Sequence, residues 1–257
     1  MDRIGKSLKM GETPDLVKYA EITDWFERLI AEIALVAERE LKQYMMNEYP
    51  FHLQIEGNYK LTKRIKTDDT LADKLLRLKT KLNRIQDFAG CRLDLECGLG
   101  AQIEFAKRLE DAYTAIGAQV NLKNYLQETQ QGYRAIHLHI TCAAGRSELQ
   151  IRTIYQAAWA NVNELLGDIF GRAHRYERIA ESHPGAYLIA DMQKLSAEIK
   201  KIEEEIDRVS SRSVNCNREQ LADPNEIGIL KNKLFSVHQE LVELATRAKK
   251  NQKDWGE

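Results

Sequence analysis

The hydrophobic positions near the start of the chain repeat at helical spacing. From Trp25 to Val36 they recur every three or four residues, and the pattern continues toward Met46. Thr13 stands directly before Pro14, a pair typical of a helix start, because a hydroxyl caps the first turn and proline tolerates its first position. We therefore expect a long opening helix.

Period-two alternation, which is typical of half-buried strands, begins after this helix. Phe51, Leu53 and Ile55 alternate with polar residues and predict a strand that closes at the Gly-Asn pair 57–58. The same reasoning predicts strands near 91–95, 119–123, 135–141 and 147–151, and helices over 67–82, 102–116 and 153–166. The alternation predicts an α/β or α+β fold, with a mixed sheet of about five strands flanked by helices.

Two apolar stripes with heptad-like spacing dominate the last third of the chain. They consist of Met192, Leu195, Ile199, Ile202, Ile206 and Val209, and of Ile227, Leu230, Leu234, Val237, Leu241 and Leu244. Such stripes predict two helices that fold back as a hairpin or pair between subunits. The connection 210–224 is polar, and we expect it to be exposed and mobile.

Composition excludes several classes of protein. The 257 residues are 43% hydrophobic and 30% charged, with four prolines, which excludes a disordered, collagen-like or disulfide-framework protein. The longest strongly apolar stretch, 29–36, has eight residues, whereas a membrane span needs about 20. The N-terminus lacks the apolar core of a secretory signal, and the four cysteines lack CxxC spacing. We expect a cytoplasmic protein with reduced thiols and no membrane partner.

Charge is nearly balanced overall but not locally. The net charge is −1, so no overall field attracts nucleic acid or a membrane. Residues 60–84, however, hold nine lysines and arginines against three aspartates, which predicts either a solvated helix face or a surface for an anion. Within this segment Lys66, Thr70, Lys74 and Arg77 are spaced so that they would share one helix face, which suits a polyphosphate.

Two carboxylates are candidates for a metal site. Asp87 lies just before the predicted strand 91–95, and Glu148 lies at the start of the predicted strand 147–151. If these strands are neighbours, both carboxylates reach one edge of the sheet, and one or two carboxylates commonly hold Mg²⁺ on a nucleoside triphosphate. Tyr133, on a predicted loop, offers a flat ring for a nucleobase. Each residue taken alone also fits a purely structural role.

Four short motifs together resemble a known family. They are R-x-K followed by a threonine at 64–70, D-x-A-G-x-R at 87–92, G-Y-R-x-x-H at 132–137 and E-x-Q-x-R-T at 148–153. Their order and spacing, over about 51–167, are similar to the synthetase domain of RelA/SpoT-type alarmone synthetases, especially the small single-domain members. The resemblance implies a nucleotidyltransferase-like fold and an ATP-dependent pyrophosphokinase. Such an enzyme moves the β,γ-pyrophosphate of ATP to the ribose 3′-hydroxyl of GDP or GTP and so makes (p)ppGpp.

The resemblance also implies roles for individual residues. Arg64 and Arg92 would sandwich the adenine of ATP, while Asp87 and Glu148 would be the catalytic carboxylates that hold Mg²⁺. Glu148 would also accept the proton of the attacking hydroxyl. The phosphates would be bound by Lys66, Thr70, Lys74 and Arg77. On the acceptor side Tyr133 would stack on the base, and the remaining residues would be Arg134, His137, Gln150 and Arg152.

Two departures from the family pattern leave the acceptor open. Many small synthetases carry a Pro-Lys pair before the G-Y-R loop, but here no cation stands between Lys123 and Arg134. Ala157 stands where some members carry asparagine or aspartate near the acceptor base. The alternative is a toxin of the same family that modifies the 3′-terminal adenosine of tRNA, with tRNA and an antitoxin protein as partners. A third alternative, from another class, is a non-catalytic nucleotide-binding or partner-binding module.

The patterns divide the chain into three parts. We expect an N-terminal helical segment (1–50), a pyrophosphokinase domain (51–185) and a C-terminal helical hairpin (186–257). None of the six histidines precedes an aspartate, so the His-Asp pair of the family's hydrolase domain is absent and no hydrolase activity is expected. Regulation would come through a homo-oligomer formed by the C-terminal helices, an allosteric nucleotide or a separate partner.

Overall fold

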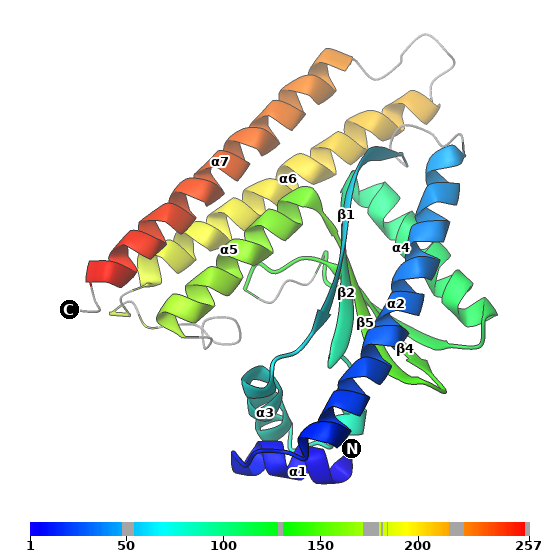
Figure 1. The fold of residues 1–257 in the computed structure, drawn as a ribbon. Helices are drawn as coiled ribbons and strands as arrows, with labels where there is room; N and C mark the ends of the chain where they lie inside the picture. The colour runs from blue at the N-terminus through cyan, green and yellow to red at the C-terminus, as the bar shows by residue number, and fades with distance from the viewer. Residues whose placement is uncertain are drawn as a thin grey trace.

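The computed structural model describes residues 1–47, 54–127, 131–171, 180, 182–183, 185–215 and 224–254. Its helices are α1 (Asp2–Met10), α2 (Leu16–Met46), α3 (Asp68–Arg77), α4 (Leu99–Ala115), α5 (Ile154–Phe170), α6 (Ala186–Asn215) and α7 (Pro224–Asp254), with a 3-10 turn at Leu82–Arg84. Its strands are β1 (Ile55–Ile65), β2 (Ala89–Cys97), β3 (Gln119–Asn124), β4 (Ile136–Cys142) and β5 (Gly145–Thr153). Figure 1 shows their arrangement.

The five strands form one mixed sheet in the order β1-β2-β5-β4-β3. β2 and β5 run parallel, and the other neighbouring pairs are antiparallel. β4 and β5 are joined by a two-residue hairpin turn at 143–144, since Cys142 pairs with Gly145. The expected mixed, helix-flanked α+β fold is therefore confirmed.

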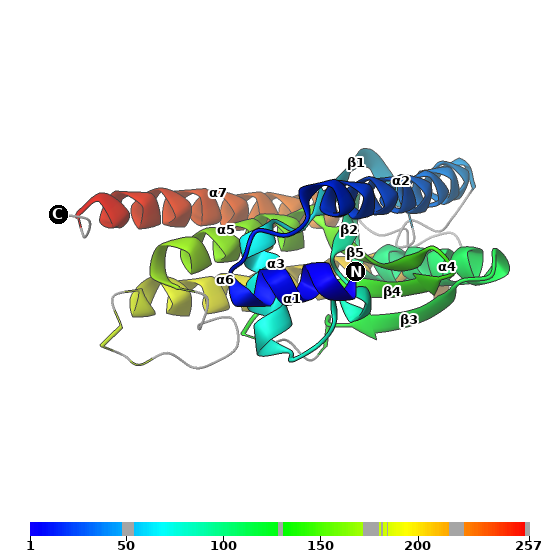
Figure 2. The ribbon, with the colours of Figure 1, turned by 60° about the horizontal axis from the view of Figure 1, so that its bottom comes forward.

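α2 and α4 cover one face of the sheet (Figures 1 and 2). Alternate residues of β2, among them Cys91 and Leu93, point into the core that these two helices share, as the period of two in a strand requires. Phe26 of α2 and Phe105 of α4 are fully or almost fully buried there. The intervening residues of β2 face the opposite side of the sheet, where the candidate site lies.

α5, α6 and α7 pack together around a second hydrophobic core. Both predicted stripes contribute to it: Ile206 is partly buried, and the other residues of the two stripes are buried. Trp159 of α5 also belongs to this core, and its indole N–H donates to the carbonyl of Met192 at 2.6 Å. The two C-terminal helices therefore fold back on each other within one chain, as the hairpin prediction states.

The predicted strand that closes at 57–58 is wrong in its end point. β1 continues through Gly57 and Asn58 to Ile65, and its pairing with β2 is irregular between Ile55 and Tyr59. The Gly-Asn pair therefore lies at an irregularity within a strand instead of a turn. The expected strand residues Phe51 and Leu53 lie outside the described residues.

Three predicted helix boundaries also differ. The helix expected over 67–82 ends at Arg77, because Lys79 adopts φ 47° and the chain then turns the buried Leu82 into the core.

The start of the long second helix also differs from the prediction. α2 is capped by Asp15, whose carboxylate accepts the backbone N–H of Lys18 at 3.2 Å, and not by Thr13. α1 was not expected. Of the connection 210–224, the part up to 215 is helical and 216–223 lies outside the described residues.

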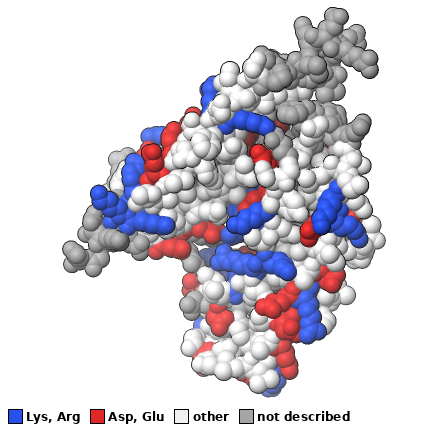
Figure 3. Space-filling model, turned by 45° about the horizontal axis from the view of Figure 1, so that its top comes forward, with Lys and Arg blue, Asp and Glu red and all other residues white. Residues whose placement is uncertain are grey.

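The surface carries charges of both signs. On the face drawn in Figure 3, lysines and arginines alternate with aspartates and glutamates instead of forming one basic surface. No helix in the described part of the chain combines the length and apolarity needed to cross a bilayer.

Candidate active site

The parallel pair β2 and β5 brings the two predicted carboxylates to one cavity. Gly90 at the start of β2 pairs with Glu148 of β5, and Asp87 comes three residues before Gly90. Both carboxylates line a cavity of about 510 Å³ that opens beside α3 and α5. The expectation that the two strands are neighbours is thus confirmed.

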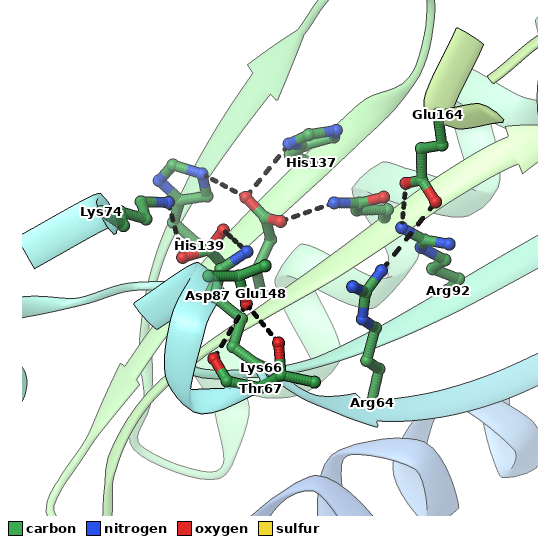
Figure 4. Close-up of polar contacts among 12 residues, drawn as sticks. Arg64, Lys66, Thr67, Lys74, Asp87, Arg92, His137, His139, Glu148 and Glu164 are labelled. Carbon is green, nitrogen blue, oxygen red and sulfur yellow. Dashed lines mark hydrogen bonds and ion pairs between the residues drawn. The ribbon is translucent and has the colours of Figure 1, made fainter. Parts of the chain in front are cut away.

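Asp87 is held by two lysines. The Lys74 ammonium lies 2.6 Å from one of its carboxylate oxygens, and the Lys66 ammonium lies 3.1 Å from the other (Figure 4). Lys66 directly follows β1 and donates its backbone N–H to the carbonyl of Phe88 at 2.9 Å, which fixes it beside Asp87. Lys74 arrives from α3. All three side chains are largely buried, which strengthens their electrostatic attraction. The cavity thus has two ammonium groups fixed beside one carboxylate.

Glu148 has neutral and imidazole partners instead. Its Oε1 lies 3.1 Å from both His137 Nδ1 and His139 Nε2, and its Oε2 accepts the side-chain N–H of Gln150 at 2.7 Å (Figure 4). Burial by itself would raise the pKa of this carboxyl, but the hydrogen bonds from the two histidines and Gln150 outweigh it and hold the pKa well below its ordinary value. Glu148, only 8% exposed, is thus an ionised carboxylate.

Two arginines converge on one carboxylate at the other side of the cavity. Arg64 pairs opposite Gly90 across the antiparallel β1–β2 pair, so Arg64 and Arg92 lie diagonally on the same face of the sheet. Glu164 of α5 forms an ion pair with each, at 3.9 Å and 2.5 Å respectively (Figure 4). The Glu164 carboxylate thus holds both guanidinium groups close to α5.

Aromatic rings line the part of the cavity near β4. The Tyr133 hydroxyl bonds to Nε2 of His137 at 2.8 Å, and the ring of Tyr125 lies edge-on to both, with centroid distances of 6.4 Å and 5.0 Å. Tyr133 has a raised pKa because it is buried, so its hydroxyl stays protonated. The three rings form a wall of the cavity with polar atoms at the ring edges. A flat nucleobase can pack against such a wall.

Eleven of the thirteen predicted site residues line this cavity or the smaller recess that continues it toward β1. They are Arg64, Lys66, Lys74, Arg77, Asp87, Arg92, Tyr133, His137, Glu148, Gln150 and Arg152. Arg152 is 2% exposed and is oriented by an ion pair with Asp94 at 2.8 Å. The roles implied for these residues remain predictions.

The structure does not bring Thr70 and Arg134 into that lining. The Thr70 hydroxyl donates to the carbonyl of Thr67 at 2.9 Å, within the first turn of α3. Arg134 is 7% exposed and turns away from the cavity, because its guanidinium donates to the carbonyl and the hydroxyl of Ser196 on α6.

Six residues that line the cavity were not predicted from the sequence, and three of them, His139, Glu164 and Tyr125, contact predicted site residues. His139 had a signal, since His137 and His139 alternate along a predicted strand and therefore share a face. Glu164 had none, because Arg64 and Arg92, with which it pairs, lie far from it in the sequence. Tyr125 lies near Tyr133 in the sequence but stands outside the four motifs.

Comparison with known proteins agrees with this geometry. Residues 63–165 match the family described as the region found in RelA / SpoT proteins. Uncharacterized proteins of Mycobacterium bovis and Mycobacterium tuberculosis are 36% identical over 197 residues, which is 75% of this chain and 67% of theirs. The chain belongs to the RelA/SpoT family.

Solved structures share the fold of this RelA/SpoT chain. Small alarmone synthetase 1 from Bacillus subtilis superimposes with a TM-score of 0.60 at 18% identity, covering 77% of this chain and 99% of that one. A GTP pyrophosphokinase family protein from Streptococcus pneumoniae gives 0.55 at 18% identity, covering 78% and 98%. The chain thus has the fold of the small alarmone synthetases, and its RelA/SpoT family is ATP-dependent and typically metal-dependent.

Proposed function

We propose that this protein transfers the β,γ-pyrophosphate of ATP to the ribose 3′-hydroxyl of GDP or GTP. The observation that carries the proposal is the pairing of two strand-edge carboxylates, Asp87 and Glu148, with a cluster of cations in one cavity. Phosphoryl-type transfer needs little beyond positioning and neutralised charge, and this cavity supplies groups for both.

The donor side is proposed to lie between β1, α3 and α5. Arg64 and Arg92 would give up their ion pairs with Glu164 in part and stack on the adenine, since planar guanidinium groups stack well on aromatic faces. Lys66 and Lys74 now pair with Asp87, and they are placed to receive the phosphates as well. Arg77 adds a further cation at the rim of the same cavity.

The two carboxylates fit a magnesium ion. Both offer carboxylate oxygens, one from just before β2 and one from near the start of the neighbouring β5, and Mg²⁺ is usually held by one or two carboxylates together with substrate phosphates. When bound, the ion would neutralise charge on the phosphoryl oxygens. The lowered pKa of Glu148 favours its role as a metal ligand over the role of a general base, which works best with a pKa near the working pH.

The acceptor side is proposed to be the aromatic wall. Tyr133 would stack on the guanine while His137 fixes its hydroxyl, and Gln150 and Arg152 would face the ribose and phosphates. The similar Bacillus subtilis synthetase binds its product pppGpp, and a further structure of it holds the ATP analogue AMPCPP. Those ligands support the same pair of substrates here.

The tRNA-directed alternative keeps one sequence observation in its favour, the lack of a cation between Lys123 and Arg134. RNA binding draws its affinity from many phosphate contacts over a wide basic surface. On the face drawn in Figure 3 charges of both signs are mixed, and no such basic surface is seen there.

The test offers ATP labelled at the γ-phosphate together with GDP, GTP or deacylated tRNA, in parallel, with products resolved by size. The proposal predicts label in a guanine nucleotide and none in tRNA, and no label in any acceptor with the Glu148→Gln variant. Label in tRNA alone would replace the proposal with the toxin alternative.

A further inference from the structure

At the Glu148 end of the cavity two imidazoles lie beside the carboxylate, and the proposed reaction gives neither of them a metal to bind. His137 Nδ1, His139 Nε2 and a Glu148 carboxylate oxygen all lie within 4.8 Å of one another. His139 stands directly opposite Glu148 in the antiparallel β4–β5 pair, and His137 stands opposite Gln150. The register of the β4–β5 pair therefore brings both imidazoles next to the Glu148 carboxylate.

The spacing of these atoms matches a coordination sphere. Glu148 Oε1 lies 3.1 Å from each of the two histidine nitrogens. With metal–ligand bonds of about 2.1 Å, adjacent ligand atoms are about 3.0 Å apart in an octahedral site and about 3.4 Å apart in a tetrahedral one. The carboxylate oxygen is thus spaced from each imidazole as two ligands of one ion would be, and all three ligand atoms lie within 4.8 Å of one another.

Charge also directs a cation to this end. Asp87 already has two lysine partners, whereas the ion-pair partners of Glu148 within the described chain are the two histidines. An ion bound there would give Glu148 a permanently charged partner, which Asp87 already has. The carboxylate lies at the wall of the open cavity, so an ion can reach it from solvent.

The histidines can present the required lone pairs. Without the ion His137 donates from Nδ1 to Glu148; to ligate through Nδ1 it must carry its ring proton on Nε2 instead, where the Tyr133 hydroxyl oxygen lies 2.8 Å away and can accept it. Such an outer partner typically orients a metal-binding imidazole. His139 would ligate through Nε2 and carry its proton on Nδ1, and its side chain is 27% exposed, so water can accept that proton.

We propose that His137, His139 and Glu148 form a site for one imidazole-binding divalent transition-metal ion of the zinc class. Two imidazoles with one carboxylate suit Zn²⁺ and Co²⁺, while Mg²⁺ prefers oxygen ligands throughout. The site shares Glu148 with the proposed magnesium pair. Zinc bound there would therefore withhold that carboxylate from magnesium and inhibit transfer, a consequence that rests on the proposed function.

The experiment titrates the full chain with Co²⁺ in the presence of millimolar Mg²⁺ and follows visible absorption. We expect one Co²⁺ per chain, displaced by one Zn²⁺. His139→Gln keeps a side-chain N–H for Glu148 but removes the imidazole, and should weaken binding at least about 10-fold, since even outer partners of a metal ligand are worth about 10- to 100-fold. His238→Gln, on α7 and away from the cavity, is the matched control and should bind as the wild type does.

Two results would overturn the inference: no Co²⁺ absorption in the wild type, or binding unchanged in His139→Gln. Should that variant fold poorly by circular dichroism, proton NMR of the wild-type Co²⁺ protein decides, since two imidazole ligands predict two shifted N–H signals and none would refute the site. The experiments distinguish the failure of the metal site from the failure of the proposed function. Pyrophosphate transfer without Co²⁺ binding contradicts the metal site alone, and Co²⁺ binding without transfer to any acceptor contradicts the proposed function alone.

Discussion

Glu148 stays ionised inside the cavity although its burial opposes a charge. The hydrogen bonds that keep its pKa low come from His137, His139 and Gln150, so the carboxylate is supported by three side chains on two strands. Asp87 is supported differently, by two ammonium groups. The two carboxylates were predicted from sequence because each precedes or begins a strand, but their different partners depend on strand register and could not be.

We expect Glu148→Gln and Asp87→Asn each to reduce pyrophosphate transfer by at least about 1,000-fold, because each keeps the volume of the side chain but removes a charge that would anchor the metal. Transfer is measured with labelled ATP, and circular dichroism checks the fold. Glu164→Gln is a control of the same chemistry, and it should lower transfer less since it only orients arginines. Near-normal turnover in the first two variants would contradict the site assignment.

A second prediction for a single residue concerns the ring of Tyr133. Tyr133→Ala should raise the KM of the acceptor about 5- to 150-fold, the worth of about 1–3 kcal/mol of base stacking, while ATP affinity changes little. Tyr133→Phe keeps the ring and removes only the hydroxyl that bonds to His137, so it should lie close to the wild type. Calorimetry of ATP binding separates the two sides: a loss of ATP affinity in Tyr133→Ala would place the ring in the donor pocket.

At the scale of elements, α6 holds the loop that presents Tyr133. The Ser196 hydroxyl bonds to the carbonyl of Gly132, and the Arg134 guanidinium bonds to Ser196. Gly132 has φ 93°, and a Cβ there would come within 3.0 Å of Trp159. Helical spacing predicts α6 and its apolar face, but nothing in the sequence links a serine on that face to a loop 64 residues away.

We therefore expect Ser196→Ala to loosen the acceptor loop. The KM of the acceptor should rise several-fold, with the KM of ATP nearly unchanged, because the donor residues lie on β1, β2 and α3. Ser236→Ala, an exposed serine on α7 with a bond only within its own helix, is the matched control. Equal changes for both substrates would indicate a general loss of stability and would refute a positioning role.

Across the whole molecule, two carboxylates on α6, the buried Glu203 and the partly buried Asp207, connect the helical hairpin to the sheet domain. Glu203 accepts hydrogen bonds from Thr153 and from Gln156, and Asp207 accepts the backbone N–H of Gly100 at 2.7 Å, at the start of α4. Burial raises the pKa of Glu203 to about 7 and that of Asp207 to about 6. The apolar stripes predict the hairpin, whereas its attachment depends on polar residues that have no periodic signal.

This attachment should make stability depend on pH. Between about pH 4.5 and 7 the folded protein keeps a proton on Glu203 that the unfolded chain has released, so the free energy of unfolding falls as the pH rises through this window. Glu203→Gln removes that cost, and near pH 8 it should raise the free energy of unfolding, relative to the wild type, by up to about 3 kcal/mol more than near pH 5. Urea denaturation at both pH values measures this. An identical difference at the two pH values would contradict the raised pKa.

The proposed reaction moves pyrophosphate from ATP as one unit. Identifying the nucleotide that remains from ATP is its most direct test. Incubation of the protein with ATP, Mg²⁺ and GDP or GTP should release one AMP for each guanine nucleotide that gains two phosphates, measured together by ion-exchange chromatography and mass spectrometry. We expect AMP in equal amount to the product and none without the acceptor. ADP as the nucleotide product, or AMP formed without an acceptor, would contradict it.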